Sequence, residues 1–263
     1  MPLFLYDLPN WLLGVIVSGL AVVLSLGAYF TFRRVHNAEY SAEERSVALA
    51  VLAVVATINS LLIAFSAVSV WDSFGSAEEA VVKEADTIGE LARDLAVYGT
   101  PESRYARTLL REYAQVVVAD EWTAMRTGGA NMVAWRKIDD VFRAVGTIEP
   151  DTLARVALLP EIWARTNELL GHRRDRLYIS QAAVPLTLWA VVLAGTALTI
   201  MTTFVLPATR FNVSMIAGLA FAIGLVFYFI IAMDRPFAGE QSVSSVPFQS
   251  AVDNMQRWDE ESQ

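Results

Sequence analysis

Four long stretches without a charged side chain constrain this chain more than any other feature of its sequence. They contain no Lys, Arg, Asp or Glu, and they cover residues 11–32, 46–71, 182–206 and 211–233. A helix needs about 20 apolar residues to cross the hydrocarbon of a bilayer, and one charged side chain at its centre costs about 2.5–3.5 kcal/mol. The sequence therefore predicts an integral membrane protein with four transmembrane helices.

The first stretch is predicted to be a retained span rather than a cleaved signal peptide. No basic residue precedes it, and no obvious small-residue cleavage site follows its apolar core. Small residues such as Gly14, Gly19 and Gly27 let a neighbouring helix approach closely. This span is therefore expected to pack inside an assembly.

Residues 72–180 are polar enough to be surrounded by water, and their apolar residues recur with helical spacing. The helix of the second span is expected to continue into this segment and to end just before Thr100, which is a suitable N-cap for the next helix. Pro160 is predicted to break a later helix, and Pro185 to kink the third span. No alternating strand pattern occurs, so the predicted fold is all-α.

The expected organisation has four parts, with a helical soluble domain inserted between spans 2 and 3. They are transmembrane helices 1 and 2 (residues 1–71), the soluble domain that continues helix 2 (72–180), transmembrane helices 3 and 4 (181–233) and an acidic C-terminal tail (234–263). Phe237 and Phe248, each preceded by proline, are expected to anchor the tail on the soluble helices.

Several classes of function are excluded by composition. The chain has no cysteine, which excludes disulfides, thiol catalysis and Cys-ligated metals, and its net charge of -8 argues against a nucleic-acid partner. The carboxylate pairs Asp120-Glu121 and Asp139-Asp140 diverge by about 100° on a helix, so neither pair forms one site. No metalloprotease, nucleophile-elbow or phosphate-loop motif occurs. We therefore predict a protein that is not an enzyme, with no catalytic residue, metal ligand or cofactor.

The second span carries a polar stripe. Asn59, Ser66 and Ser73 fall on one helical face with Ile63, and Ser69 lies beside them. Polar side chains within a span usually face other protein or a watery cavity. Two interpretations stay open: a water-filled path, or hydrogen bonding between helices and of serine to its own backbone.

Several sequence features occur together along nearly the whole chain. They are Phe65 with Trp71-Asp72 at the end of the second span, Glu84-Ala85, Glu121-Trp122, and above all Asp234-Arg235-Pro236-Phe237-Ala238-Gly239-Glu240 followed by Val246-Pro247-Phe248. In these features the chain resembles the bacterial bestrophin-like family, small four-span relatives of the bestrophin chloride channels.

The resemblance implies a pentameric ion channel whose second spans line an axial pore. The expected pore-lining or neck residues are Ile58, Asn59, Leu62, Phe65, Ser66 and Ser69, with vestibule charge from Asp72 and Glu79. The family motif at the exit of span 4 comprises Asp234, Arg235, Pro236 and Phe237. We expect Arg235 to pair with an acidic group and Phe237 to dock on the helical domain. The tail lacks the dense acidic cluster of a calcium clasp, so calcium gating is not implied.

The expected function is therefore a homo-oligomeric channel for small inorganic ions in a lipid membrane. The resemblance favours anions such as chloride, whereas a ring of Asp72, Glu78 and Glu79 would favour cations. A different class of function stays open: a non-conducting scaffold or sensor whose helical domain binds a partner protein.

The orientation signals conflict. With four spans, both termini and the helical domain lie on one side of the bacterial inner membrane. The short loops on the other side carry Arg33, Arg34, Arg45 and Arg210. Because short cytoplasmic loops are usually rich in Lys and Arg, this signal places those loops in the cytoplasm. Four basic residues expected to flank the membrane on the domain side dilute that signal: Arg173, Arg174, Arg176 and Arg235. The resemblance implies a cytoplasmic domain and cytoplasmic termini, which is the orientation we expect.

Overall fold

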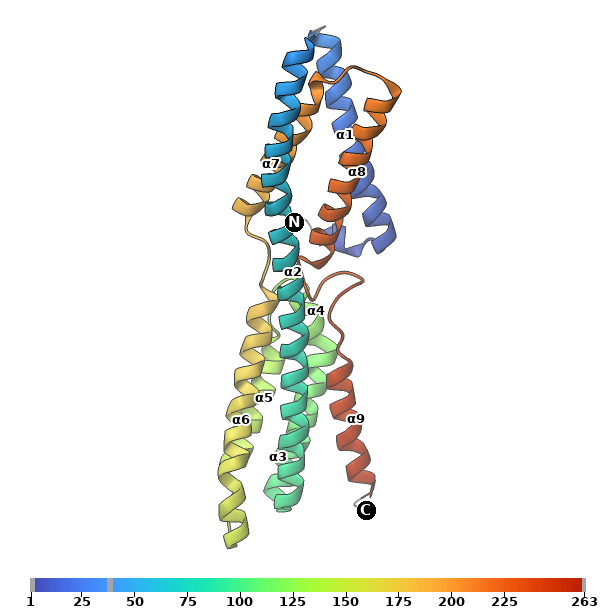
Figure 1. The fold of residues 1–263 in the computed structure, drawn as a ribbon. Coiled ribbons are helices and arrows are strands. Elements are labelled where there is room, and N and C mark those ends of the chain that lie inside the picture. The colour runs from blue at the N-terminus through green and yellow to red at the C-terminus, as the bar shows by residue number, and fades with distance from the viewer. Residues whose placement is uncertain (1–2, 37–39, 262–263) are drawn as a thin grey trace. The chain divides into compact units, whose positions relative to one another are not determined.

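The computed structural model describes residues 3–36 and 40–261, and every regular element within these ranges is a helix (Figure 1). Four helices are long and apolar enough to cross a membrane. The predicted all-α fold with four spans is therefore confirmed. The chain divides into two compact units: unit 1 comprises Met1–Asp72, Ala183–Asp234 and Gly239–Gln241, and unit 2 comprises Ser73–Ala182, Arg235–Ala238 and Ser242–Gln263.

Unit 1 holds the four apolar segments. Thr209 caps the last of its helices, because the threonine hydroxyl accepts a hydrogen bond from the Asn212 amide at 3.2 Å. Its elements are η1 (Leu3–Asp7), α1 (Asn10–His36), the first part of α2 (Ala42–Tyr98), α7 (Leu186–Thr202), η3 (Thr203–Val205) and α8 (Arg210–Met233).

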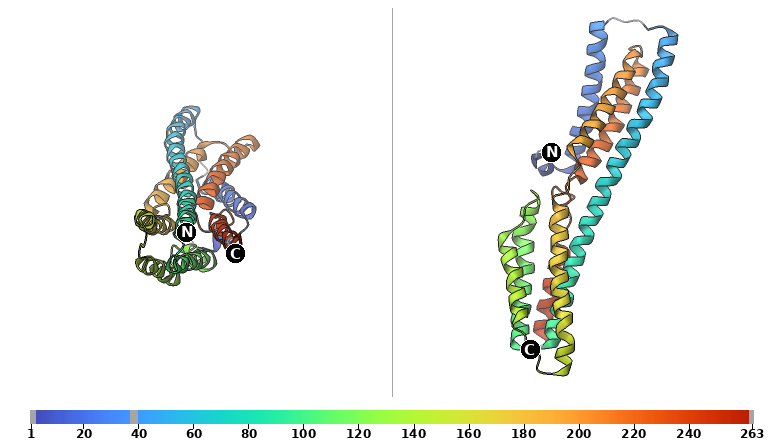
Figure 2. Two further views of the ribbon diagram at one scale, coloured as in Figure 1. Left: turned by 90° about the horizontal axis from the view of Figure 1, so that it is seen from below. Right: turned by 90° about the vertical axis from the view of Figure 1, so that its left-hand side faces the viewer.

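Helices α1 and α8 pack against each other more extensively than any other pair in unit 1 (Figure 2). Their backbones come close at Gly224, where an added Cβ atom would lie 2.7 Å from the Ser18 Cα atom and 3.1 Å from the Ala21 Cβ atom. These distances are shorter than van der Waals contact, so the close approach requires glycine.

Replacing Gly224 with Ala is expected to lower the melting temperature of the purified protein. The new methyl group forces the α1 backbone away from α8, and overpacking of this kind costs about 1–3 kcal/mol. Gly218→Ala is the matched control, because a Cβ atom at Gly218 on the same helix meets nothing within 4 Å. Equal melting temperatures for the two variants would contradict the close packing.

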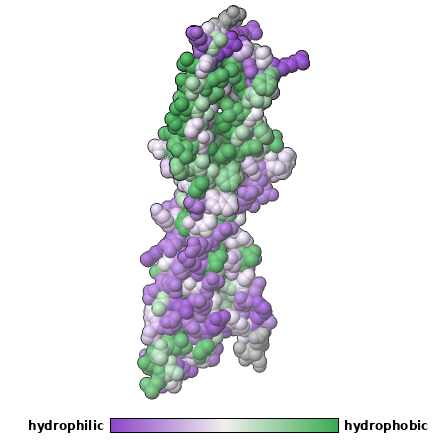
Figure 3. Space-filling model, in the orientation of Figure 1, coloured by the Kyte–Doolittle hydropathy of each residue, from purple (hydrophilic) through white to green (hydrophobic). Residues whose placement is uncertain are grey.

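The surface of unit 1 carries many large apolar side chains, seen as green in Figure 3. Trp11, Val23, Phe30 and Phe211 are among the exposed ones. A water-exposed surface of this kind is rare, whereas contact with lipid or with other membrane helices requires it.

Unit 2 is a bundle of helices whose starts follow the sequence signals. The Thr100 hydroxyl accepts a hydrogen bond from the Ser103 amide at 3.2 Å, with Pro101 as the first helical residue, as predicted. Its elements are the second part of α2, α3 (Pro101–Val116), η2 (Val117–Glu121), α4 (Trp122–Met125), α5 (Met132–Gly146), α6 (Leu153–Ser180) and α9 (Val246–Glu261).

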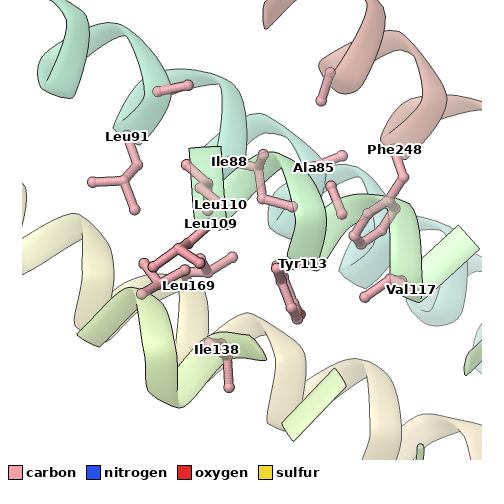
Figure 4. Close-up of a cluster of buried hydrophobic side chains, with 14 of the residues drawn as sticks. Ala85, Ile88, Leu91, Leu109, Leu110, Tyr113, Val117, Ile138, Leu169 and Phe248 are labelled. Atoms are coloured by element: carbon pink, nitrogen blue, oxygen red, sulfur yellow. The ribbon is translucent and has the colours of Figure 1, made fainter. Parts of the chain in front are cut away.

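The core of unit 2 contains side chains from helices far apart in the sequence (Figure 4). Ile88 of α2, Leu110 and Tyr113 of α3, Ile138 of α5 and Phe248 of α9 are all fully buried. The burial of Phe248 confirms that the C-terminal tail lies on the soluble helices, and it shows that the tail completes their core.

Two predictions about proline were wrong. Pro160 lies inside α6, which continues unbroken to Ser180. Burial of Ile162 and Leu169 in the core offsets the hydrogen bond that Pro160 cannot donate. Pro185 does not kink a helix, since it immediately precedes the first residue of α7, where a missing N–H leaves no partner unpaired.

Candidate functional site

The membrane-spanning part of α2 has one face that the rest of unit 1 does not cover. Ile58 is 58% exposed and Phe65 is 64% exposed, and Asp72 is also exposed. These residues are seven positions apart, which places them on one side of the helix at intervals of about two turns. Leu62, half-buried, and Ser69, exposed, extend the same stripe. We call this stripe the open face of α2.

The side of α2 next to the open face, turned from it by about 90°, is buried against α7. The Asn59 Nδ2 atom donates to the Thr196 hydroxyl at 3.2 Å, and the Ser66 hydroxyl donates to the Leu62 carbonyl of its own helix at 2.9 Å. A Cβ atom at Gly195 would lie 2.3 Å from the Asn59 Oδ1 atom, so the two helices touch closely. Within the protomer, Asn59 therefore bonds to a neighbouring helix and Ser66 to its own backbone. This agrees with the interpretation of the polar stripe as hydrogen bonding between helices and of serine to its own backbone.

The predicted pore-lining residues thus divide between two adjoining faces of α2. Ile58, Leu62, Phe65 and Ser69 lie on the open face, whereas Asn59 and Ser66 lie on the side that packs inside unit 1. The family resemblance grouped them as bulky residues near Leu62 and Phe65 with the polar residues around them, without information on which residues the other helices cover. Sequence reasoning also passed over three exposed apolar residues that flank the open face: Val54, Leu61 and Val68.

The two predicted vestibule charges have different surroundings. Asp72, the last residue of the α2 segment in unit 1, is exposed. Glu79, in unit 2, is exposed and forms an ion pair with Lys83 at 2.6 Å, one helical turn further along α2. Lys83 therefore offsets part of the charge of Glu79, while Asp72 has no basic residue within four positions on α2.

The motif at the end of α8, Asp234 to Phe237, makes contacts within each unit through different residues. In unit 1, the Asp234 carboxylate accepts hydrogen bonds from the Val184 amide at 2.6 Å and from the Tyr6 hydroxyl at 3.1 Å. Asp234 is buried, so these bonds compensate for the water that it loses. The motif thereby ties the start of α7 and the N-terminal segment to the end of α8.

In unit 2, Phe237 is buried against Trp122, with the ring centroids 5.7 Å apart in an edge-to-face arrangement. The Pro236 carbonyl accepts from the Val243 amide at 2.8 Å. The expected ion pair between Arg235 and an acidic group does not occur among the described residues, and the Arg235 Nε atom is buried there without a hydrogen-bond partner. Asp234 is already used by Tyr6 and Val184.

Unit 2 also contains a buried ionic cluster that sequence reasoning missed. Two guanidinium groups and two carboxylates, from Arg173, Arg176, Glu84 and Glu121, are fully buried. Arg173 binds Glu121 through both oxygens at 2.6 and 2.7 Å. Arg176 bridges Glu84 at 2.6 Å and Glu121 at 2.8 Å. The cluster has no net charge, because the two positive groups balance the two carboxylates.

Aromatic side chains surround the cluster. The Tyr113 hydroxyl donates to Glu84 and accepts from Arg173 at 3.1 Å. The Arg173 guanidinium lies 4.6 Å from the centre of the Trp135 ring, and Arg176 lies 5.3 Å from that of Phe248. These contacts place each cation over an aromatic face, which favours it electrostatically.

The two arginines favour the charged form of Glu121. Burial alone raises the pKa of the Glu121 carboxyl, but Arg176 and Arg173 outweigh it and hold that pKa below its ordinary value. Burial, reinforced by the charge of Glu84, raises the pKa of the Tyr113 hydroxyl, so it stays protonated and donates to Glu84. Such a cluster of paired charges orients the helices that carry it.

The local sequence explains why these side chains meet. Arg173 and Arg176 are three residues apart and face the same side of α6. Arg174, between them, is exposed. A short π-helical segment, η2, brings Glu121 inward while its neighbour Asp120 stays exposed. The expectation that Arg173 and Arg176 flank the membrane was wrong, because both are buried among helices of unit 2.

The described residues contain no group of three or more His, Asp or Glu side chains placed to hold a metal ion. The features with chemical consequence are therefore the open face of α2, the motif after α8 and the buried ionic cluster.

Comparison with known proteins gives a consistent result. Residues 19–248 match the family defined by the bestrophin-like domain. Two crystal structures of a bacterial bestrophin homologue from Klebsiella pneumoniae are similar. A tyrosine-to-alanine variant has a TM-score of 0.63 and 10% identity and covers 93% of this chain and 95% of its own. A leucine-to-threonine variant has a TM-score of 0.63 and 12% identity and covers 94% of this chain and 95% of its own. At these identities the likeness establishes the fold. No curated protein matches the sequence.

Proposed function

The chain belongs to the bestrophin-like family, and from this premise we propose that it forms a homo-oligomeric ion channel whose α2 helices line the pore. The observation that carries the proposal is the open face of α2. One side of α2 is buried in its own protomer. The open face is therefore free to line a pore on an axis shared by several copies of the chain. We propose five copies, as the resemblance to bestrophins implies.

The side chains of the open face support a narrow, hydrophobic neck. Phe65 is the largest of them, with Ile58 two turns before it and Leu62 between them. A ring of such side chains blocks ions by excluding water from the path, without a physical plug. In this arrangement Asn59 and Ser66 lie beside the pore-lining stripe: Asn59 bonds α2 to α7, and Ser66 bonds the backbone of its own helix.

For the conducted ion we propose an anion, chloride in the first place. Family resemblance supports this choice, and the pairing of Glu79 with Lys83 weakens the acidic ring that would favour cations. Cation selectivity is the competing assignment, since Asp72 and Glu78 are exposed on α2. We further propose a multi-pass protein of the inner membrane with a cytoplasmic helical domain.

A scaffold or sensor is the second candidate. Exposed apolar side chains in unit 2 favour it, because Leu153 is 90% and Tyr178 80% exposed. Such residues suit a partner protein, or a neighbouring copy in an oligomer.

The test of the channel is ion flux through liposomes that contain the purified protein, together with its mass. We expect an oligomer with measurable conductance, and Asp72→Asn to shift selectivity towards anions. Removal of one charge about 10 Å from the ion path changes its energy by about 0.4 kcal/mol in water, or about twofold in permeability ratio per subunit. The reversal potential in a salt gradient measures this shift.

Asp139→Asn is the charge-matched control, because Asp139 is exposed on α5 and lies outside the proposed pore. Its reversal potential is expected to equal that of the parent. A mass of only 28.9 kDa, both in mild detergent and in nanodiscs, would contradict the oligomer and the pore together.

A further inference from the structure

Unit 2 contains a cavity of about 580 Å³ between the end of α2, α3 and α9. Its walls carry Arg104, Arg107, Arg111 and Asp259, together with the apolar side chains of Ala96 and Met255. The volume lies in the range of about 300–1,000 Å³ that is typical of pockets for small molecules.

The three arginines form a basic stripe along one face of α3. Their spacing of three and four residues turns them to the same side of the helix. One carboxylate, Asp259, serves two of them: it lies 2.5 Å from Arg107 and 2.8 Å from Arg111. The lining residues therefore carry a net charge of about +2, in a chain whose own net charge is -8.

The arginines have hydrogen-bonding capacity that the protein does not use. The side chain of Arg107 is only 12% exposed, yet its buried Nε atom has no hydrogen-bond partner within residues 3–36 and 40–261. The other contacts of Arg107 and Arg104 go to backbone carbonyls, of Met255 at 3.0 Å and Gly99 at 3.1 Å. Arg104 and Arg111 also line the cavity, and among the described residues each uses only one N–H donor, so their guanidinium groups have donors free for an acceptor in the cavity.

We infer that this cavity, the arginine pocket, binds a small phosphate-bearing anion. A phosphate carries close to two negative charges and several acceptor oxygens, which matches the excess of two positive charges and the fork of guanidinium donors. Asp259 occupies part of the place of that anion and acts as an internal competitor. Ala96 and Met255 provide an apolar wall for the organic part of an organic phosphate. The inference does not rest on the proposed channel.

The first test is titration calorimetry of the full chain in nanodiscs, with inorganic pyrophosphate as the probe. We expect saturable binding at one site per protomer, weakened about tenfold or more by Arg107→Gln, because a hydrogen bond to a charged group is lost. Arg165→Gln is the matched control: Arg165 pairs with Glu90 and Asp94 in the same unit but does not line the pocket.

Asp259→Asn is expected to change the affinity for pyrophosphate in the opposite direction from Arg107→Gln, and it leaves Arg107 in place. Removal of the internal carboxylate is expected to strengthen pyrophosphate binding severalfold. No binding by the parent, equal losses in Arg107→Gln and Arg165→Gln, or unchanged affinity in Asp259→Asn would each overturn the site.

The source of the phosphate is decided by a third comparison. Nanodiscs of phosphatidylcholine with added phosphatidic acid are titrated with the same pyrophosphate. A soluble ligand leaves the apparent affinity for pyrophosphate unchanged, and a lipid headgroup lowers it by competition. Both outcomes support a phosphate site and identify its natural ligand class.

Discussion

Arg176→Met is expected to lower the free energy of unfolding by about 3–5 kcal/mol, the usual cost of removing one member of a buried ion pair. Among the residues that the structure describes, Arg176 alone bonds directly to both Glu84 and Glu121, at 2.6 and 2.8 Å. Without it, two carboxylates are buried with a single remaining guanidinium. Denaturant unfolding of the full chain, followed by the fluorescence of tryptophans beside the cluster such as Trp122, measures the effect.

Arg174→Met is the control, since it removes the same charge from an exposed position two residues earlier on α6. It is expected to change stability by less than about 0.5 kcal/mol. If the two variants unfold alike, the cluster does not hold unit 2 together. A further variant, Arg176→Met with Glu84→Gln, is expected to recover part of the loss, because one uncompensated charge is then removed.

Phe65→Ala is expected to raise ion flux by about tenfold or more if the open face of α2 lines a hydrophobic neck. Truncation of the largest side chain widens the path and lets water enter, which removes the barrier to ions. Leu62→Ala is expected to act in the same direction but less, since Leu62 is half-buried. Ile58 and Ser69 belong in the same scan. Single-channel recording and liposome flux measure the change, at constant oligomer mass.

Phe30→Ala provides the matched control. Phe30 is 49% exposed on α1, so the same truncation occurs in another span. It is expected to leave conductance unchanged. The channel proposal fails if neither the parent nor any α2 variant carries current at either salt polarity. The scaffold would then be the better assignment.

Much of the fold was predictable because its signals are local. The length of the stretches without charged residues predicts the spans. Thr100-Pro101 predicts the start of a helix, and the structure has a helix start at the same residues. The proline predictions failed because tertiary packing overrides a local preference. Pro160 stays helical where the next turns of α6 are buried in the core.

The candidate site was harder to predict, because which face of α2 is buried depends on its neighbours. Asn59 and Ser66 are polar in either interpretation, and only the contacts with α7 place them inside the protomer. The ionic cluster was missed for a related reason. Arg173 and Arg176 look like membrane-flanking cations in sequence, and their partners Glu84 and Glu121 are 92 and 52–55 residues away. Their spacing of three residues on one helix was the available signal.

The burial of Phe248 has a consequence for synthesis on the ribosome. This ring closes the core of unit 2 over Arg176 and Trp122, yet α9 follows the last two membrane spans in the chain. At about 5–20 residues per second, translation from the end of α6 to Phe248 takes about 3–14 s. During that interval the nascent helices lack part of their core, while α7 and α8 enter the bilayer. The soluble bundle can therefore be completed only after both of the last two membrane spans have been translated.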